Sequence, residues 1–154
     1  MPKKRIRNFQ GRNFKKVREE DKLSPQIRSL QMSKIHSKET KLELILTTLL
    51  KRSILNKFTT NVNEIKGKPD VVFPKEKLCI FVDSDFWHGW QYPRWRHLLK
   101  DDSWREKIRN NRKRDMKTSS LLKRKGFKVL RVWEHQLKSG DYILTKAREL
   151  LKSE

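Results

Sequence analysis

The chain has 154 residues, 34% of them hydrophobic, so its length fits one compact domain with a small core and an additional arm. Its 39 Lys and Arg residues outnumber 18 acidic residues and give a net charge of +21. This excess predicts a polyanionic partner, most simply nucleic acid, although a purely structural basic protein would share it. We expect no membrane partner, because no apolar run approaches the roughly 20 residues that span a bilayer and no apolar segment follows the basic N-terminus.

The N-terminal part divides into an arm and a first helix. Residues 1–30 are basic and lack sustained periodicity, which predicts a flexible arm, with the folded domain at residues 31–154. The helix is expected to begin near residues 37–40 and to end at about Arg52, because Leu42, Ile45, Leu46 and Leu49 form one apolar stripe. Thr40 and Glu43 have the spacing of a capping box, which favours a helix start at this point.

Strands and helices are predicted along the rest of the chain. Strands are expected at Phe58–Val62, Asp70–Phe73, Leu78–Asp83 and Lys128–Trp133, and helices at Trp104–Lys125 and Tyr142–Leu151. Pro74–Lys77 has the composition of a turn, Gly126 suits the end of the long helix, and residues 84–103 are expected to form an aromatic, basic loop. The order of helix, three-strand meander, helix, strand and helix predicts an α/β fold, with a small mixed sheet flanked by helices.

Two aspartates mark neighbouring strand ends. Asp70 opens one expected strand and Asp83 closes its antiparallel neighbour, so both should lie at the same end of the sheet. Carboxylate oxygens are the ligands that Mg²⁺ prefers in proteins. Aspartate is also common in turns at strand ends, so the spacing alone leaves a metal site and a structural role open.

Five motifs occur in one order along the chain. They are MSKIHSKETKLE (residues 32–43), GKPD (67–70), IFVDSDFWHG (80–89), WREKIRNNRKRD (104–115) and GFKVLRVWEH (126–135). Together they resemble the PD-(D/E)xK nuclease superfamily and, more narrowly, its very short patch repair (Vsr) mismatch endonucleases. The resemblance covers roughly residues 31–137 and implies a restriction-endonuclease-like core and Mg²⁺-dependent DNA cleavage.

The resemblance also implies roles for individual residues. Asp70 would bind the metal ion, together with the backbone carbonyl of Val82, and Glu43 would be a further active-site carboxylate unless it serves only as a helix cap. His88 would activate the attacking water as general base, its alternative being a loop histidine bonded to the backbone. Asp83 stands where well-studied members have histidine, and we expect it to be a second metal-binding acid.

Aromatic residues would recognise the DNA. Phe86, Trp87 and Trp104 match a wedge that enters between base pairs from the major groove, and Met32 matches a residue that enters from the minor groove. Unstacking costs less at a mismatch, so such a wedge could favour T·G pairs. Trp104 could instead be a core residue, because it opens an amphipathic helix.

The chain departs from the family at a zinc site. Well-studied members hold zinc with three cysteines and one histidine, at positions that here read Asp85, Trp90, Tyr92 and His135. We therefore expect no structural zinc, with Trp90, Tyr92 and Trp95 packed in its place. The position of the usual superfamily active-site lysine is occupied here by Asp85, so no lysine takes that role. This favours His88 as the general base.

The combined expectation is a Mg²⁺-dependent endonuclease that nicks double-stranded DNA at T·G mismatches, as a monomer. A restriction-type enzyme that dimerises to cut both strands is the alternative, and a non-catalytic basic DNA-binding protein is a third. The single Cys79, which cannot form an intramolecular disulfide, suits a reducing cytoplasm, so we expect a bacterial-type, nucleoid-associated protein. The sequence leaves any repair or methyltransferase partner open.

Overall fold

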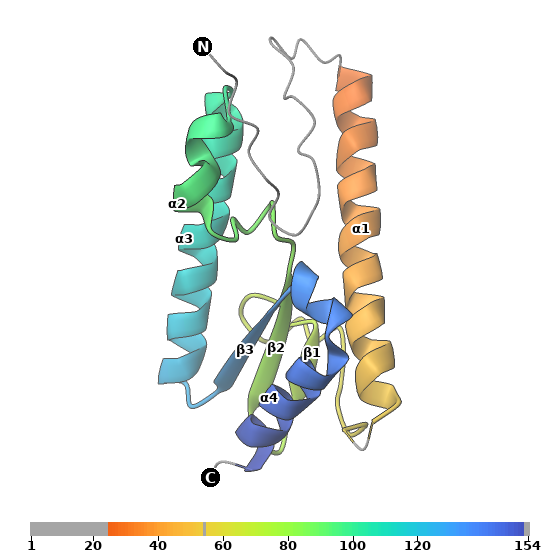
Figure 1. The fold of residues 1–154 in the computed structure, drawn as a ribbon. Coiled ribbons are helices and arrows are strands. Elements are labelled where there is room, and N and C mark those ends of the chain that lie inside the picture. The colour runs from red at the N-terminus through yellow and green to blue at the C-terminus, as the bar shows by residue number, and fades with distance from the viewer. Residues whose placement is uncertain (1–24, 54, 153–154) are drawn as a thin grey trace.

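A mixed three-stranded sheet lies between helices in the computed structural model, which describes residues 25–53 and 55–152 (Figure 1). Most side chains of residues 25–39 are outside this description. In chain order the elements are α1 (Pro25–Lys51), β1 (Val71–Phe73), β2 (Leu78–Asp83), α2 (Tyr92–Trp95), the 3₁₀ turn η2 (Arg96–Leu98), α3 (Asp102–Arg124), β3 (Lys128–Trp133), the 3₁₀ turn η3 (Glu134–Lys138) and α4 (Gly140–Lys152). None of the described helices combines the length and the apolar character needed to cross a membrane.

The sheet has the order β1-β2-β3. β1 and β2 form an antiparallel hairpin in which Val71 pairs with Ile80, and β3 lies parallel to β2, with Asp83 opposite Trp133. A parallel neighbour requires a crossover, which α3 supplies. The fold is therefore the expected small mixed sheet flanked by helices.

Helices cover both faces of the sheet (Figure 1). On one face, Leu46 and Leu50 of α1 and Ile143 of α4 form a core with β-strand residues such as Ile80 and Val132. On the other face, Leu122 of α3 packs with three strand residues: Val72, Cys79 and Phe81. Alternate residues of β2 thus face opposite cores, which explains why its sequence LCIFV is continuously apolar.

The helix start predicted near Thr40 is wrong. α1 begins at Pro25, where proline suits the first helical turn, and Thr40 lies in the helix interior. Thr40 and Glu43 therefore form no N-terminal capping box. Residues 26–36 lack an apolar stripe but contain neither glycine nor proline, so nothing in their sequence interrupts the helix. The predicted arm boundary at residue 30 falls inside α1, and the remainder of the arm lies outside the described residues.

The strand predicted at Phe58–Val62 is also wrong. Only an isolated bridge pairs Thr59 with Val72, and Asn61 has a positive φ of 56°, which ends extended pairing. Val62 instead packs beside the α3-facing core. Consequently the predicted three-strand meander is reduced to the β1–β2 hairpin. The predicted bounds Leu78–Asp83 and Lys128–Trp133 are confirmed, and the loop at residues 84–103 contains the short α2 and η2.

Candidate active site

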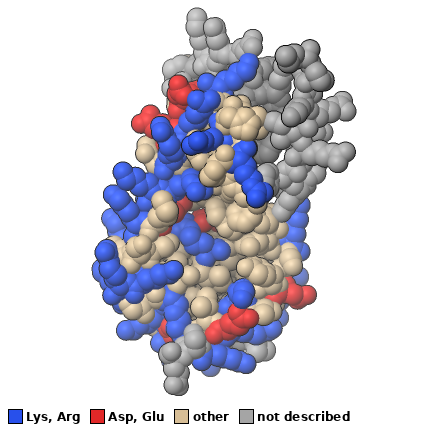
Figure 2. Space-filling model, turned by 60° about the vertical axis from the view of Figure 1, so that its left-hand side comes forward, with Lys and Arg blue, Asp and Glu red and all other residues tan. Residues whose placement is uncertain are grey.

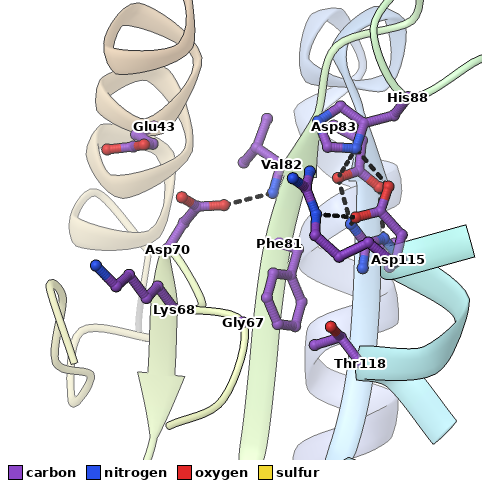
Figure 3. A pocket seen from close by; sticks show the side chains of 12 residues that line it. Glu43, Gly67, Lys68, Asp70, Phe81, Val82, Asp83, His88, Asp115 and Thr118 are labelled. Atoms are coloured by element: carbon purple, nitrogen blue, oxygen red, sulfur yellow. Dashed lines mark hydrogen bonds and ion pairs between the residues drawn. The ribbon is translucent and has the colours of Figure 1, made fainter. Parts of the chain in front are cut away.

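A polar pocket lies at the end of the sheet where β2 finishes, between α1 and α3 (Figure 3). It is lined by four carboxylates, one imidazole and three cationic side chains: Glu43, Asp70, Asp83, Asp115, His88, Lys68, Arg114 and Arg131. The structure thus brings together the four residues predicted as catalytic, from α1, the start of β1, the end of β2 and the following loop. It adds Asp115 and Arg131, which the sequence prediction did not assign.

The GKPD segment fixes the position of Asp70. Gly67 has φ +90°, and a Cβ at this position would overlap Cγ2 of Thr118 on α3. Lys68 also has a positive φ, of 50°, and its N–H donates to the carbonyl of Ile65. This tight turn against α3 leads directly into β1, so glycine is required where the backbone approaches the helix.

Asp70 belongs to the hairpin through its backbone and to the pocket through its side chain. Its N–H donates to the Ile80 carbonyl at 3.0 Å, and its Oδ2 accepts from the Val82 N–H at 2.6 Å. Burial raises the pKa of Asp70; the Val82 hydrogen bond opposes this, the nearby Glu43 and Asp83 add to it, and the result is about 7. Figure 3 shows Glu43 facing Asp70 across the pocket. A cation between these carboxylates would remove the cost that this pKa reflects.

Asp83 is held by an arginine. It is 2% exposed, and its two oxygens accept from Nε and Nη2 of Arg131 at 2.5 and 2.6 Å. Nη2 of Arg131 also lies 3.3 Å from Oδ1 of Asp115. Arg131 therefore bridges β3, the end of β2 and α3, and it balances the buried Asp83 and the partly buried Asp115.

His88 is oriented by carboxylates. Its Nδ1 lies 2.6 Å from Oδ2 of Asp115 and 3.3 Å from Oδ1 of Asp83. Burial lowers the pKa of His88, but the hydrogen bond to Asp115 and the charge of Asp83 outweigh it, so the pKa is raised above its ordinary value. The same contact and Arg131 lower the pKa of Asp115 despite its burial. The ring thus meets acids rather than the backbone group that a structural loop histidine would contact.

The sequence carries a signal for the two missed residues. Asp115 lies seven residues after the buried Ile108 and seven before the buried Leu122, so it shares the buried stripe of α3. Arg131 interrupts the apolar strand KVLRVW. A charged residue in such a position needs a partner, and the two lie in one ion-pair network.

Comparisons with known proteins decide the family. The family described as DNA mismatch endonuclease Vsr matches residues 20–94. The chain is similar to the type II nicking enzyme V.XorIIP of Xanthomonas oryzae pv. oryzae, 35% identical over 136 residues, which cover 85% of this chain and 96% of the relative. It is also similar to the nicking enzyme V.NmeAIP of Neisseria meningitidis, 40% identical over 127 residues, with 81% and 89% covered. The DNA mismatch endonuclease Vsr of Escherichia coli is 31% identical over 125 residues, with 78% and 77% covered.

The chain belongs to the Vsr endonuclease family. It is therefore a DNA endonuclease, and its sheet and flanking helices are the restriction-endonuclease-like fold of that family. Its surface suits this substrate: Figure 2 shows many Lys and Arg side chains on one face, with a few acidic atoms recessed among them and other acidic side chains near its upper and lower ends. Such a face attracts the phosphate backbone irrespective of base sequence.

The aromatic residues predicted as a wedge contact one another, and two of them, Phe86 and Trp87, directly precede His88 in the loop after β2. The Trp87 ring lies 4.9 Å from Phe86 and 4.8 Å from Trp104, between centroids, and Nζ of Lys107 lies 4.5 Å from its centre. All three rings are partly buried, and Phe86 and Trp104 pack against the cluster of Tyr92, Trp95, Leu99 and Ile108. Trp104 therefore has a packing role, and its insertion into DNA stays a prediction. Met32 lies in α1, but its side chain is outside the described residues.

The positions that hold zinc in well-studied Vsr enzymes form a different cluster here. Nδ1 of His135 lies 2.8 Å from Oδ1 of Asp85, so the two metal-capable groups bind each other. The Trp90 ring packs on His135 at 4.7 Å and on Trp133 at 4.9 Å. Tyr92 and Trp95 are buried nearby, as expected from the sequence. The loop after β2 is thus joined to η3 by ring contacts, by the Asp85–His135 pair, and by hydrogen bonds that the Ser84 hydroxyl and the Asp85 N–H donate to Oε2 of Glu134.

Proposed function

We propose that this endonuclease nicks double-stranded DNA at T·G mismatches, as a monomer, with a Mg²⁺ ion bound at Asp70 and with His88 as general base. The observation that carries the proposal is the division of the pocket. Asp70 and Glu43 face each other on the α1 side of β2, whereas His88 and Asp115 lie on the α3 side (Figure 3). A metal-binding group and a base on opposite sides of one cleft suit a phosphodiester between them.

The donor set on the α1 side fits Mg²⁺. Asp70 and Glu43 supply carboxylate oxygens. The pKa of Asp70 is raised mainly by burial, with the charges of Glu43 and Asp83 adding to it, and a bound cation would offset this cost. The Val82 N–H points toward Asp70, and since the N–H and C=O of one strand residue face the same neighbour, its carbonyl lies on that side too. When bound, the ion would polarise the phosphate. Asp83 could join it only by releasing Arg131.

The role of His88 as general base follows from its hydrogen bond to Asp115. When His88 is neutral, its Nδ1–H donates to Asp115, and this leaves the Nε2 lone pair to accept a proton from water. Hydrogen bonds orient such a ring and select its tautomer, as in other His–Asp pairs. This arrangement supplies the role that the absent superfamily lysine would otherwise have.

Two findings favour a mismatch nick. The E. coli relative is named as a mismatch endonuclease and the other relatives as nicking enzymes. In addition, Phe86 and Trp87 lie two and one residues before His88. Any base-pair step that these rings open would therefore lie close to the His88 imidazole. Because unstacking costs less at a T·G pair, we expect DNA with this mismatch to be cleaved faster than matched DNA.

The test compares three substrates in Mg²⁺: supercoiled plasmid, a matched duplex and a duplex with one T·G pair. We expect a single nick 5′ of the mispaired thymine, its loss in EDTA, and its loss in Asp70→Asn. Equal cleavage of both strands in the matched duplex, by a protein that gel filtration shows to be a dimer, would establish the restriction-type alternative. Binding without cleavage of any substrate, unchanged by Asp70→Asn and His88→Ala, would establish a non-catalytic protein.

A further inference from the structure

Arg131 is a charged residue in the middle of a strand that helices cover. It lies in β3 between Leu130 and Val132, and its guanidinium carbon sits 4.8 Å from the centre of the Phe81 ring. The side chain is mostly buried. Burying a charge is costly unless other groups compensate for it, so the reason for this arginine must lie in what it contacts.

The contacts of Arg131 coincide with a set of possible metal ligands. Asp83, His88 and Asp115 each offer a ligand atom, and these atoms all lie within 4.8 Å of one another. Arg131 contacts two of the three, Asp83 through both nitrogens of its fork and Asp115 through Nη2 at 3.3 Å. A planar guanidinium matches a carboxylate at two points and stays charged at all accessible pH values.

We propose that Arg131 is a built-in cation that takes the place of a metal ion beside Asp83 and Asp115. The site then keeps one exchangeable divalent ion, at Asp70. This inference rests on the proposed function, because it needs the Asp70 metal site as its reference.

Charge and geometry explain why the arginine would exclude a second ion. A divalent cation at the Asp83–His88–Asp115 cluster would need the same Asp83 oxygens that Arg131 holds, and it would stand beside a like charge. A fixed cation also has a benefit that an exchangeable ion lacks. It keeps the two acids at Nδ1 of His88 whether or not metal is bound, so the base stays oriented.

The experiment counts Mn²⁺ ions per chain by equilibrium dialysis and by electron paramagnetic resonance. The full chain is expected to bind one Mn²⁺, and Asp70→Asn to lose it. Arg131→Gln, which removes the charge but retains a polar side chain, should bind a second Mn²⁺, and adding Asp115→Asn should remove that ion. Arg131→Lys, the matched control that keeps the charge, should still bind one.

Asp83→Asn in the otherwise unchanged protein gives an independent measurement. It should leave the count at one Mn²⁺, because Asp83 would be no ligand. Loss of the ion in Asp83→Asn would overturn the inference, and so would a single ion in folded Arg131→Gln. Retention of full Mn²⁺ binding by Asp70→Asn would instead contradict the proposed metal site, so the two failures are distinguishable.

Discussion

Nδ1 of His88 and Oδ2 of Asp115 lie 2.6 Å apart, although 27 positions separate the residues in the chain. His88 follows β2, and Asp115 projects from the middle of α3. The helix that connects β2 to its parallel neighbour β3 thus also completes the site. The position of Asp115 beside His88 therefore depends on α3, the crossover helix that also makes β3 parallel to β2.

Removing the general base His88 or its orienting partner Asp115 should slow cleavage. We expect His88→Ala to reduce the single-turnover rate by about 10²–10⁴-fold, the usual contribution of a positioned base. Asp115→Asn should reduce it by about 10²-fold or more, because the ring loses its orienting acceptor. Asp102→Asn is the control, since this acid of α3 is 90% exposed. A full rate in Asp115→Asn would refute its role.

The pH dependence of cleavage should reflect the raised pKa of His88. A base works deprotonated, so the rate should increase as pH rises through a value above the ordinary 6.5 and then level off. Asp115→Asn removes a group that raises this pKa, and the increase should move to lower pH. Single-turnover rates across the pH range test this. An unchanged midpoint in Asp115→Asn would mean that another group titrates.

Asp70→Asn should stabilise the metal-free protein. The pKa of Asp70 is about 7 in the folded chain against 3.8 in the reference state, so the folded state favours the protonated acid. The stability that protonation provides is fully present below 3.8 and is lost as pH rises to about 7. With partial exposure discounted, the gain from asparagine should be about 1–3 kcal/mol at alkaline pH and vanish below pH 3.8. Urea unfolding at both pH values measures it, and a loss of stability at alkaline pH would contradict it.

Trp87→Ala should lower the preference for T·G over matched DNA. Stacking of one base on an aromatic ring contributes roughly 1–3 kcal/mol, which corresponds to about 5- to 150-fold in rate or affinity. Trp87→Phe retains a ring and should keep most of the preference. A 2-aminopurine beside the mismatch reports unstacking through its fluorescence. An unchanged signal and preference in Trp87→Ala would remove Trp87 from the wedge.

Gly89→Ala should destabilise the fold and displace the neighbouring His88. Gly89 has φ +69°, and a Cβ there would lie 2.8 Å from Cγ2 of Ile108 and 3.0 Å from Cδ of Arg112. We expect a loss of about 1–3 kcal/mol in the free energy of unfolding, together with slower cleavage. Gly126→Ala is the control: its φ is +81°, but a Cβ there meets nothing within 4 Å. Equal effects of both substitutions would show that crowding at Gly89 is unimportant.

Local patterns predicted the elements best where burial and periodicity agree. β2 and β3 have the predicted bounds, because an apolar strand between turns is specified by its own residues. The start of α1 was missed because the sequence of residues 26–36 shows no sustained apolar periodicity. The Phe58–Val62 segment has strand-like composition, yet a positive φ at Asn61 prevents a ladder.

The sequence by itself determined the family motifs, the basic surface and the identity of Asp70, Asp83, Glu43 and His88 as residues of one site. Only the tertiary structure decided how they are paired. Asp83 meets Arg131 and His88 meets Asp115 because β3 lies parallel to β2 and α3 crosses behind both. Contacts between residues 27 and 48 positions apart follow from strand order and burial, which no local spacing encodes.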